Sequence, residues 1–332
     1  MGAPIAHGGD LDAARRLFPE APEPWVDLST GINPVPYPCP PLEASAFTRL
    51  PSAADLAGLI AAAAEAYGAD PEAIVAAPGT QILIETLPRL RPPSRVAVLG
   101  PTYAEHAAAW KRGGHVVETV PDLESADGAD VVVVVNPNNP DGRLRAKPDL
   151  LSAAEKLNRM KGLLVIDEAF ADFEAICSAS CAVGRGIVVL RSFGKSYGLA
   201  GLRLGFAIAA PDRAEAIRQA LGPWAVAGPA LAIGRAALSD RPWREAAARA
   251  RAADAGRLDR MILRAGGRLV GGTCLFRTAD FSDGPALFRR LGQAGIYVRR
   301  FEDAPHRLRF GLPADKTEWC RLSRILRRDE LG

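Results

Sequence analysis

The sequence has few cysteines and no arrangement of them that is typical of a disulfide framework or a zinc site. Its five cysteines form no Cys-x-x-Cys pair, and only four histidines accompany them. An odd, scattered set of thiols fits reduced cysteines in a cytoplasmic protein without a bound metal. The cysteines are Cys39, Cys177, Cys181, Cys274 and Cys320.

An excess of charge of one sign is also missing, as are long apolar segments. The 41 Lys and Arg residues against 38 Asp and Glu give a net charge of +3. This small excess argues against a nucleic-acid partner and leaves anionic small molecules open. No stretch has the length of a membrane span, and the N-terminal residues lack the apolar core of a secretory signal. We therefore expect a small-molecule ligand, with no nucleic-acid or membrane partner.

Short apolar runs alternate with helical stretches between residues 74 and 209. The runs are continuously apolar, which indicates strands covered on both faces and therefore a mostly parallel sheet. The sequence predicts an α/β fold whose large domain has three layers, α/β/α, around seven strands. The expected strands are Ile74–Ala77, Arg95–Leu99, His115–Val120, Val131–Val135, Leu163–Asp167, Gly186–Arg191 and Gly205–Ala209.

The remaining segments differ in composition from this region. Residues 212–262 are rich in Ala and Arg with few helix breakers, which predicts long helices. The last seventy residues mix expected strands (Gly272–Thr278, Ile296–Arg300, Leu308–Leu312) with helices, as in a smaller α+β domain. The first 45 residues are rich in proline. We expect an N-terminal arm for substrate or dimer contacts (1–45), a large domain (46–212) and a small domain (213–332).

A glycine-rich segment, residues 191–205, follows one of the expected strands. Ligands of open α/β sheets bind at the carboxyl ends of the strands. The amine of Lys195 can form an imine with an aldehyde cofactor, while the Ser192 hydroxyl and the Arg203 guanidinium hold its phosphate. Taken alone, the segment fits a glycine-rich loop with a surface lysine equally well.

Acidic and amide side chains follow two further strands. Asp167 and Glu168 end one of them, and a carboxylate there can pair with a protonated pyridine nitrogen. We prefer Asp167 because it directly follows the apolar run, although an acidic helix cap is a common alternative. The segment Asn136–Gly142 is stiffened by two prolines and can present an Asn amide to a phenolic oxygen. An ordinary Asn-Pro turn is the alternative there.

Two more segments complete the set. Gly79 and Thr80 precede an apparent helix that starts near Ile82, where free backbone N–H groups can cradle a phosphate. Tyr103 follows the next strand and can offer its face to an aromatic ring. Each segment alone also fits a structural role, a helix cap for Gly79 and Thr80 and a buried core side chain for Tyr103. The order and spacing of all the segments favour one cofactor site.

Taken in order, these motifs resemble fold-type I pyridoxal-phosphate (PLP) enzymes, in particular the histidinol-phosphate aminotransferase branch. The resemblance implies that Lys195 carries PLP as a Schiff base and moves protons, and that Asp167 binds the pyridine nitrogen. It implies further that Tyr103 stacks on the ring and that Asn139 contacts the phenolic oxygen and the substrate. The PLP phosphate is then held by Gly79, Thr80, Ser192 and Arg203.

Other positions of the resemblance concern the substrate. Leu308-Arg309-Phe310-Gly311 is similar to the segment whose arginine clamps the substrate carboxylate, a task that suits a guanidinium fork. Many relatives have Tyr where this chain has Phe170, and that hydroxyl also contacts the phenolic oxygen. The resemblance also implies a homodimer, with residues 33–38 as a candidate contact.

The N-terminal residues are similar to threonine-phosphate decarboxylases of cobalamin biosynthesis, in His7-Gly8-Gly9-Asp10 and in Asp27-Leu28-Ser29-Thr30-Gly31-Ile32-Asn33-Pro34. Those enzymes convert L-threonine O-3-phosphate into (R)-1-amino-2-propanol O-2-phosphate and carbon dioxide. The likeness implies His7, Asn33 and Arg299 as donors to the substrate phosphate, with Arg300 as the alternative to Arg299. Relatives often have Asn where this chain has Asp10, whose charge disfavours direct contact. The alternative is that Asp10 only caps a helix.

The reaction type stays open between two enzymes. In PLP enzymes the Cα bond that stands perpendicular to the ring is the one that breaks. The same residues can therefore support decarboxylation, which we favour, or transamination of a phosphorylated amino compound by a histidinol-phosphate-type aminotransferase. A non-enzymatic regulator is a third class, but its usual marks, an added DNA-binding domain or a lost lysine, do not occur in this sequence.

Overall fold

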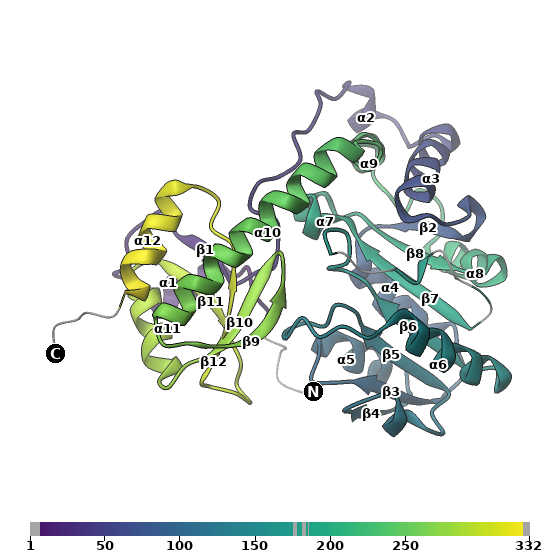
Figure 1. The fold of residues 1–332 in the computed structure, drawn as a ribbon. Helices are drawn as coiled ribbons and strands as arrows, with labels where there is room; N and C mark the ends of the chain where they lie inside the picture. Colours follow the sequence, from purple (N-terminus) through teal and green to yellow (C-terminus); the bar gives the residue numbers. More distant parts are fainter. Residues whose placement is uncertain (1–6, 175–177, 181–183, 185, 328–332) are drawn as a thin grey trace. The chain divides into compact units, whose positions relative to one another are not determined.

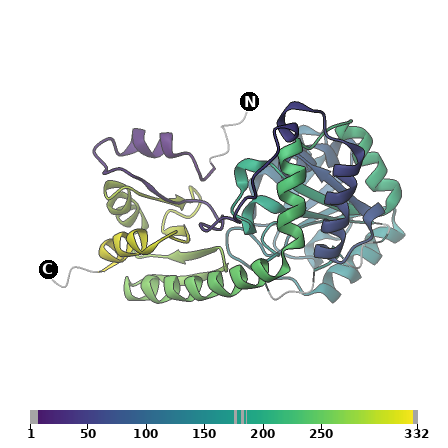
Figure 2. The ribbon, with the colours of Figure 1, turned by 90° about the horizontal axis from the view of Figure 1, so that it is seen from above.

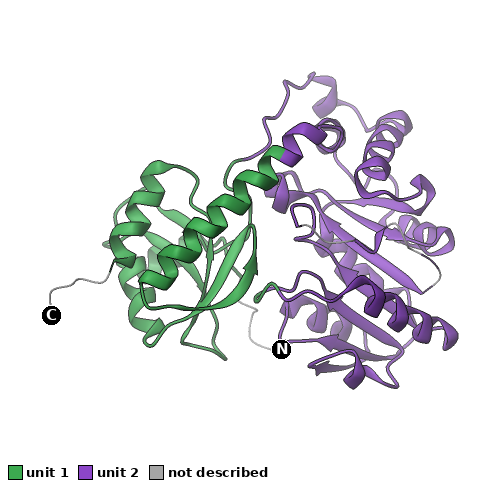
Figure 3. Ribbon diagram, in the orientation of Figure 1, with its two compact units in different colours: residues 1–35, 140–142, 246–332 green, residues 36–139, 143–245 purple. Residues whose placement is uncertain are grey.

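The computed structural model describes residues 7–174, 178–180, 184 and 186–327. Cys177 and Cys181 lie outside the described residues. The chain forms two compact units (Figures 1 and 3): unit 1 comprises Met1–Val35, Pro140–Gly142 and Ala246–Gly332, and unit 2 comprises Pro36–Asn139 and Arg143–Glu245. In the described part of the chain, no helix is both long enough and apolar enough to cross a membrane.

Unit 2 is built on a seven-stranded sheet with the order β2-β8-β7-β6-β5-β3-β4. β8 runs antiparallel to both of its neighbours, and the other neighbouring pairs are parallel. The mostly parallel seven-stranded sheet predicted from the sequence is therefore confirmed. The strands are β2 (Ile74–Ala77), β3 (Arg95–Leu99), β4 (Val116–Val120), β5 (Val131–Val135), β6 (Leu163–Asp167), β7 (Ile187–Ser192) and β8 (Gly205–Ala209).

Helices cover both faces of this sheet, which explains its continuously apolar strands. In β5, Val132 and Val134 belong to one buried cluster, whereas Val131 and Val133 belong to the cluster on the opposite face. The helices and 3-10 turns of unit 2 are α2 (Ser45–Thr48), α3 (Ala53–Tyr67), η1 (Pro71–Ala73), α4 (Thr80–Arg89), α5 (Ala104–Arg112), η2 (Glu124–Ala126), α6 (Lys147–Arg159), α7 (Phe193–Ser196), η4 (Ala200–Leu202), α8 (Pro211–Leu221) and α9 (Gly228–Ser239).

Unit 1 holds a five-stranded sheet with the order β1-β11-β12-β10-β9. β1 is parallel to β11, and the other pairs are antiparallel. The strands are β1 (Val26–Leu28), β9 (Arg268–Thr273), β10 (Phe276–Asp280), β11 (Ile296–Arg300) and β12 (Arg307–Gly311). The helices are α1 (Leu11–Leu17), α10 (Arg241–Arg264), which is the long green helix of Figure 2 and begins within unit 2, α11 (Gly284–Gln293) and α12 (Lys316–Leu326).

One face of this smaller sheet carries its apolar core. Leu28, Val298 and Phe310 are fully buried there, together with Leu258 of α10 and Leu322 of α12. Because side chains alternate along a strand, the residues between them lie on the opposite face of the sheet. That second face holds polar residues, among them Arg299 and Arg309.

The prediction of a single strand over Gly272–Thr278 is wrong, because the chain turns back there. β9 ends at Thr273, β10 begins at Phe276, and the Thr273 hydroxyl accepts a hydrogen bond from the Leu275 N–H at 3.1 Å. Leu275 and Phe276 are both fully buried. The apolar pattern therefore continues through the turn and conceals it in the sequence.

The compact units also differ from the predicted domain ranges. β1 lies within the expected arm, yet it pairs with β11 of unit 1, a partner almost at the other end of the chain. α9 lies beyond the expected boundary at residue 212, yet its Leu231 and Leu238 belong to the buried cluster of unit 2. Both differences arise from contacts between residues far apart in the sequence.

Candidate cofactor and substrate sites

Asp167 ends β6 with a buried carboxylate whose orientation is fixed on both oxygens. Oδ2 lies 2.8 Å from Nε2 of His106, which is itself only 1% exposed, and Oδ1 accepts a hydrogen bond from the Ala169 N–H at 3.0 Å. His106 belongs to α5, and no motif in the sequence singled it out. A carboxylate held in this way suits a counterion to a protonated ring nitrogen.

The neighbouring Glu168 has a different environment. Its Oε2 pairs with Nη1 of Arg191 at 2.5 Å, and its Oε1 accepts from the Ala179 N–H at 2.9 Å. Arg191 also pairs with Asp172 and lies 4.7 Å above the Tyr67 ring. Burial lowers the pKa of Arg191, but the two carboxylates outweigh burial and leave that pKa above its ordinary value. Glu168 therefore belongs to a buried ion-pair cluster with Arg191 and Asp172.

Gly79 and Thr80 meet Arg203 at the start of α4. Gly79 adopts φ +86°, and a Cβ added there would lie 2.6 Å from Nη2 of Arg203. A Cβ on Gly205 would lie 2.7 Å from the backbone nitrogen of Thr80. The absence of side chains at these glycines keeps the backbone N–H groups at the start of α4 close to a guanidinium, an arrangement that suits a phosphate. The helix begins at Thr80, two residues earlier than the sequence predicted.

Lys195 lies on α7, the short helix that directly follows β7. Ser192 ends β7 and precedes the helix, so both residues stand at the same edge of the sheet as Asp167, which ends the parallel neighbour β6. Nζ of Lys195 lies 5.8 Å from the centre of the buried Phe170 ring. Tyr197 stacks between Phe193, at 4.4 Å, and Trp243, at 5.6 Å, which stiffens the turn that carries Lys195.

Tyr103 immediately precedes α5, and its hydroxyl donates to Oε1 of Gln81 at 3.2 Å.

The loop after β5 is held in place by hydrogen bonds of Asn136 and Asn138. Asn136 exchanges hydrogen bonds with the backbone of Arg145, at 2.8 and 3.2 Å. Asn138 accepts from the Thr102 hydroxyl at 2.6 Å and donates to a backbone carbonyl. Asn139, the expected cofactor contact, follows these two anchored residues.

Together these residues fit PLP. The glycine-lined start of α4 suits the cofactor's phosphate, the fixed Asp167 carboxylate suits its ring nitrogen, and the amine of Lys195 suits its aldehyde. The structure brings each of these groups to unit 2. Among the described residues, no group of three or more His, Cys, Asp or Glu side chains is arranged to hold a metal ion.

In unit 1, Arg299 and Arg309 are directly opposite each other on β11 and β12, so both lie on the face away from the apolar core. Arg309 is 7% exposed, and its Nη2 donates to the Ser29 carbonyl at 2.8 Å. Burial, together with a smaller contribution from the neighbouring Arg299, lowers the pKa of Arg309 to about 10, and Asp27 opposes both effects. The Arg300 guanidinium instead lies 4.9 Å from the ring of Phe288, on α11.

Two further expected substrate residues, Asn33 and His7, belong to the N-terminal part of unit 1. Asn33 is buried, and its Oδ1 accepts from the Val35 N–H and from Nη1 of Arg251, both at 3.1 Å. Arg251, on α10, is a further residue that the sequence did not single out. His7 precedes a tight contact between Gly8 and Ser29. Asp10 accepts from the Ala13 N–H at 2.8 Å and caps α1.

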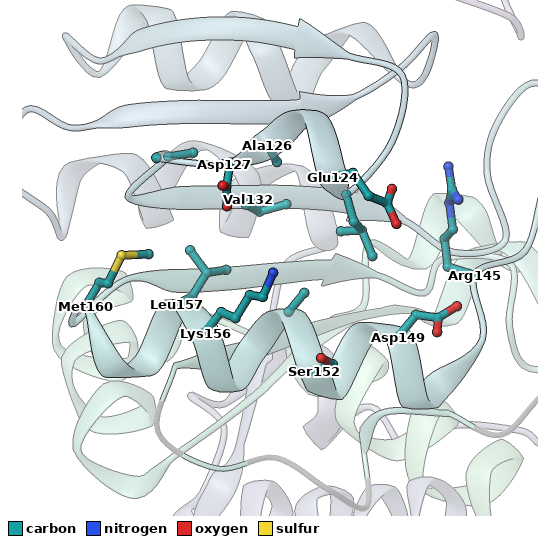
Figure 4. Close-up of a pocket in the computed structure, with 14 residues that line it drawn as sticks. Glu124, Ala126, Asp127, Val132, Arg145, Asp149, Ser152, Lys156, Leu157 and Met160 are labelled. Atoms are coloured by element: carbon teal, nitrogen blue, oxygen red, sulfur yellow. The ribbon is translucent and has the colours of Figure 1, made fainter.

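A separate pocket of about 200 Å³ lies between η2 and α6 (Figure 4). Acidic and basic side chains mix around it, and it includes none of the residues selected from the sequence. The labelled charged residues of its lining are Glu124, Asp127, Arg145, Asp149 and Lys156.

Comparison with known proteins identifies the family. The family model "Aminotransferase class I and II" matches residues 33–321. The chain is 42% identical to a threonine-phosphate decarboxylase of Pseudomonas aeruginosa, over 97% of both chains, and 42% identical to another from a Sinorhizobium species, over 100% of both.

Solved structures show the same fold. Histidinol-phosphate aminotransferase from Sinorhizobium meliloti, in complex with pyridoxal-5'-phosphate, superposes with a TM-score of 0.78 at 21% identity, covering 98% of this chain and 94% of that one. L-threonine-O-3-phosphate decarboxylase from Porphyromonas gingivalis gives 0.75 at 18% identity, covering 91% and 98%. The chain therefore belongs to the aminotransferase class I and II family and is a full-length relative of threonine-phosphate decarboxylases.

Proposed function

We propose that this protein is a PLP-dependent lyase that decarboxylates L-threonine O-3-phosphate to (R)-1-amino-2-propanol O-2-phosphate in cobalamin biosynthesis. The observation that carries the proposal is the 42% identity to a threonine-phosphate decarboxylase over 97% of both chains. The residues of unit 1 support it, because the paired Arg299 and Arg309 match a substrate with two anionic groups.

The residues of unit 2 hold the cofactor in this proposal. Lys195 binds the aldehyde carbon, Asp167 faces the ring nitrogen, Tyr103 covers the ring, and Asn139 donates to the phenolic oxygen. The start of α4, with Gly79 and Thr80, binds the phosphate together with Ser192 and Arg203. When bound, PLP would supply an electron sink for the electron pair of the Cα–carboxylate bond.

The side chains of the protein then complete the reaction. Arg309 binds the substrate carboxylate with its guanidinium fork until carbon dioxide leaves. His7, Asn33 and Arg299 donate to the substrate phosphate, and Asn139 also contacts the substrate. The ammonium group of Lys195 delivers one proton to Cα, which replaces the lost carboxylate, and Lys195 recovers a proton from solvent.

Product analysis tests this proposal. The protein is mixed with PLP and threonine phosphate, without a keto acid, and the products are identified by mass spectrometry. We expect carbon dioxide and aminopropanol phosphate in equal amounts, and none from a Lys195→Ala variant. A histidinol-phosphate-type aminotransferase would instead be inactive without a keto acceptor and would consume one when it is supplied. That result would overturn the proposed reaction.

We further propose that the enzyme works as a homodimer in the cytoplasm. The family resemblance supports the dimer, and residues 33–38 are its candidate contact. The described cysteines, Cys39, Cys274 and Cys320, are free thiols, which supports a reducing compartment. Light scattering on the purified holoenzyme tests the dimer, since a monomeric mass at micromolar concentration would contradict it.

A further inference from the structure

Ser29, the residue directly after β1, is a point of convergence in unit 1. The residue is fully buried, and its backbone N–H, its carbonyl oxygen and its hydroxyl each have a hydrogen-bond partner. Its N–H donates to Oδ1 of Asp27 at 2.9 Å, and its hydroxyl donates to the same oxygen at 2.6 Å. The hydroxyl also accepts from the Gly9 N–H at 2.7 Å, and the carbonyl accepts from Arg309 at 2.8 Å.

The N-terminal segment approaches Ser29 more closely than any side chain would permit. A Cβ on Gly8 would lie 2.3 Å from the Ser29 carbonyl oxygen, and Gly9 adopts φ +90°. Only glycine accommodates both the close approach and the left-handed backbone without strain. The hydrogen bond from Gly9 to the Ser29 hydroxyl then fixes the segment, and with it the position of His7, next to the residue that Arg309 contacts.

We infer that Ser29 is a positioning residue that sets the enzyme's specificity for phosphorylated substrates, because it seats the His7–Gly9 turn beside the Arg299–Arg309 pair. The inference rests on the proposed function, in which His7 and Arg299 bind the substrate phosphate. Ser29 itself does not touch the substrate in this account. Its hydroxyl holds the turn, whereas its carbonyl contact with Arg309 is made by the backbone and survives replacement of the side chain.

Asp27 orients the Ser29 hydroxyl, which accepts the hydrogen bond from Gly9. Its Oδ1 accepts the hydroxyl proton, so the oxygen lone pair of Ser29 is directed to the Gly9 N–H. The same carboxylate acts on Arg309 electrostatically and offsets the repulsion from Arg299. One acidic side chain therefore serves both anion-binding elements of unit 1.

The experiment compares kinetics of the holoenzyme and its variants with threonine phosphate. Ser29→Ala removes one hydrogen bond to the turn, and we expect KM to rise about tenfold while kcat changes by less than about twofold. Gly8→Ala disrupts the close contact between residue 8 and the Ser29 carbonyl but leaves the Ser29 side chain unchanged. We expect the same rise in KM. Ser323→Ala on α12 and Gly256→Ala on α10 make matched changes elsewhere in unit 1 and leave KM unaltered.

A double-mutant cycle separates positioning from general damage. If Ser29 acts through His7, then Ser29→Ala in a His7→Ala background raises KM by less than about a further twofold. Full multiplication of the two effects, or an unchanged KM in both Ser29→Ala and Gly8→Ala, overturns the inference while the wild type remains an active decarboxylase. A wild-type enzyme that releases no carbon dioxide overturns the proposed function, and this inference with it.

Discussion

The two units hold their functional side chains by different physical means. In unit 2, the positions of the functional residues are set mainly by the backbone. Asp167 and Ser192 stand where strands end, and Thr80 stands where α4 begins. In unit 1, buried arginines are held by hydrogen bonds, Arg309 to Ser29 and Arg251 to Asn33, and Asp27 stabilises the charge of Arg309. Changes in unit 2 should therefore affect chemistry most, and changes in unit 1 should affect substrate binding and its dependence on pH.

The largest effect is expected at Lys195. Replacement by Ala removes the amine that binds the cofactor and moves the proton, so carbon dioxide release should fall by at least about a thousandfold. Turnover of threonine phosphate by Lys195→Ala and wild type measures the loss. Lys161→Ala, which removes a lysine that follows α6, is the control and should retain wild-type activity.

The next prediction compares Asp167 with His106, the residue that orients its carboxylate. Asp167→Asn should lower kcat by about a hundredfold or more, because a neutral amide cannot balance a protonated ring nitrogen. His106→Asn should lower kcat by about tenfold, since His106 only orients that carboxylate. Steady-state kinetics test the order, and a loss at His106 that exceeds the loss at Asp167 would contradict these roles.

A neighbouring pair of residues tests the unit 1 site. Arg299→Ala should raise KM for threonine phosphate by about tenfold to a hundredfold, since it removes a charged donor to the phosphate. Arg300→Ala should change KM by less than about threefold, because the Arg300 guanidinium packs over Phe288 on the other face of the sheet. The reverse order would show that the substrate approaches a different face.

The electrostatic balance at Arg309 predicts a specific dependence on pH. Burial and Arg299 lower the pKa of Arg309 to about 10. A base with a lowered pKa loses its charge on the alkaline side, so KM should rise as the pH passes through about 10. In Asp27→Asn the favourable carboxylate is gone, the pKa of Arg309 falls further, and the rise should begin at lower pH. Identical KM profiles for the two proteins would contradict this balance.

The smallest effect concerns Phe170. A Phe170→Tyr variant adds a hydroxyl near the cofactor, and donation to the ionised phenolic oxygen favours the charged form. The pH-dependent change in absorbance of the bound cofactor should therefore shift to lower pH, with little change in kcat. Spectrophotometric titration measures the shift, and a shift to higher pH would exclude this contact.

The same difference between the units explains how far the sequence alone reaches. Residues of unit 2 such as Asp167 and Lys195 follow continuous apolar strands within a short distance, so the strand pattern places them at one edge of the sheet. His106 escaped selection because only the fold brings α5 to the end of β6. In unit 1, β1 pairs with a strand near the other end of the chain, and the contacts of Ser29 and Arg251 depend on that pairing. The hydrophobic periodicity of a short sequence segment does not indicate contacts between residues so far apart in the chain.

The most direct test of the account is reduction of the PLP-treated protein with borohydride, followed by peptide mapping. We expect the protein to turn yellow with PLP and a single pyridoxyl label to appear on Lys195. The chain offers five other lysines as internal controls: Lys111, Lys147, Lys156, Lys161 and Lys316. A label on one of these in place of Lys195, or no yellow colour at all, would contradict the account.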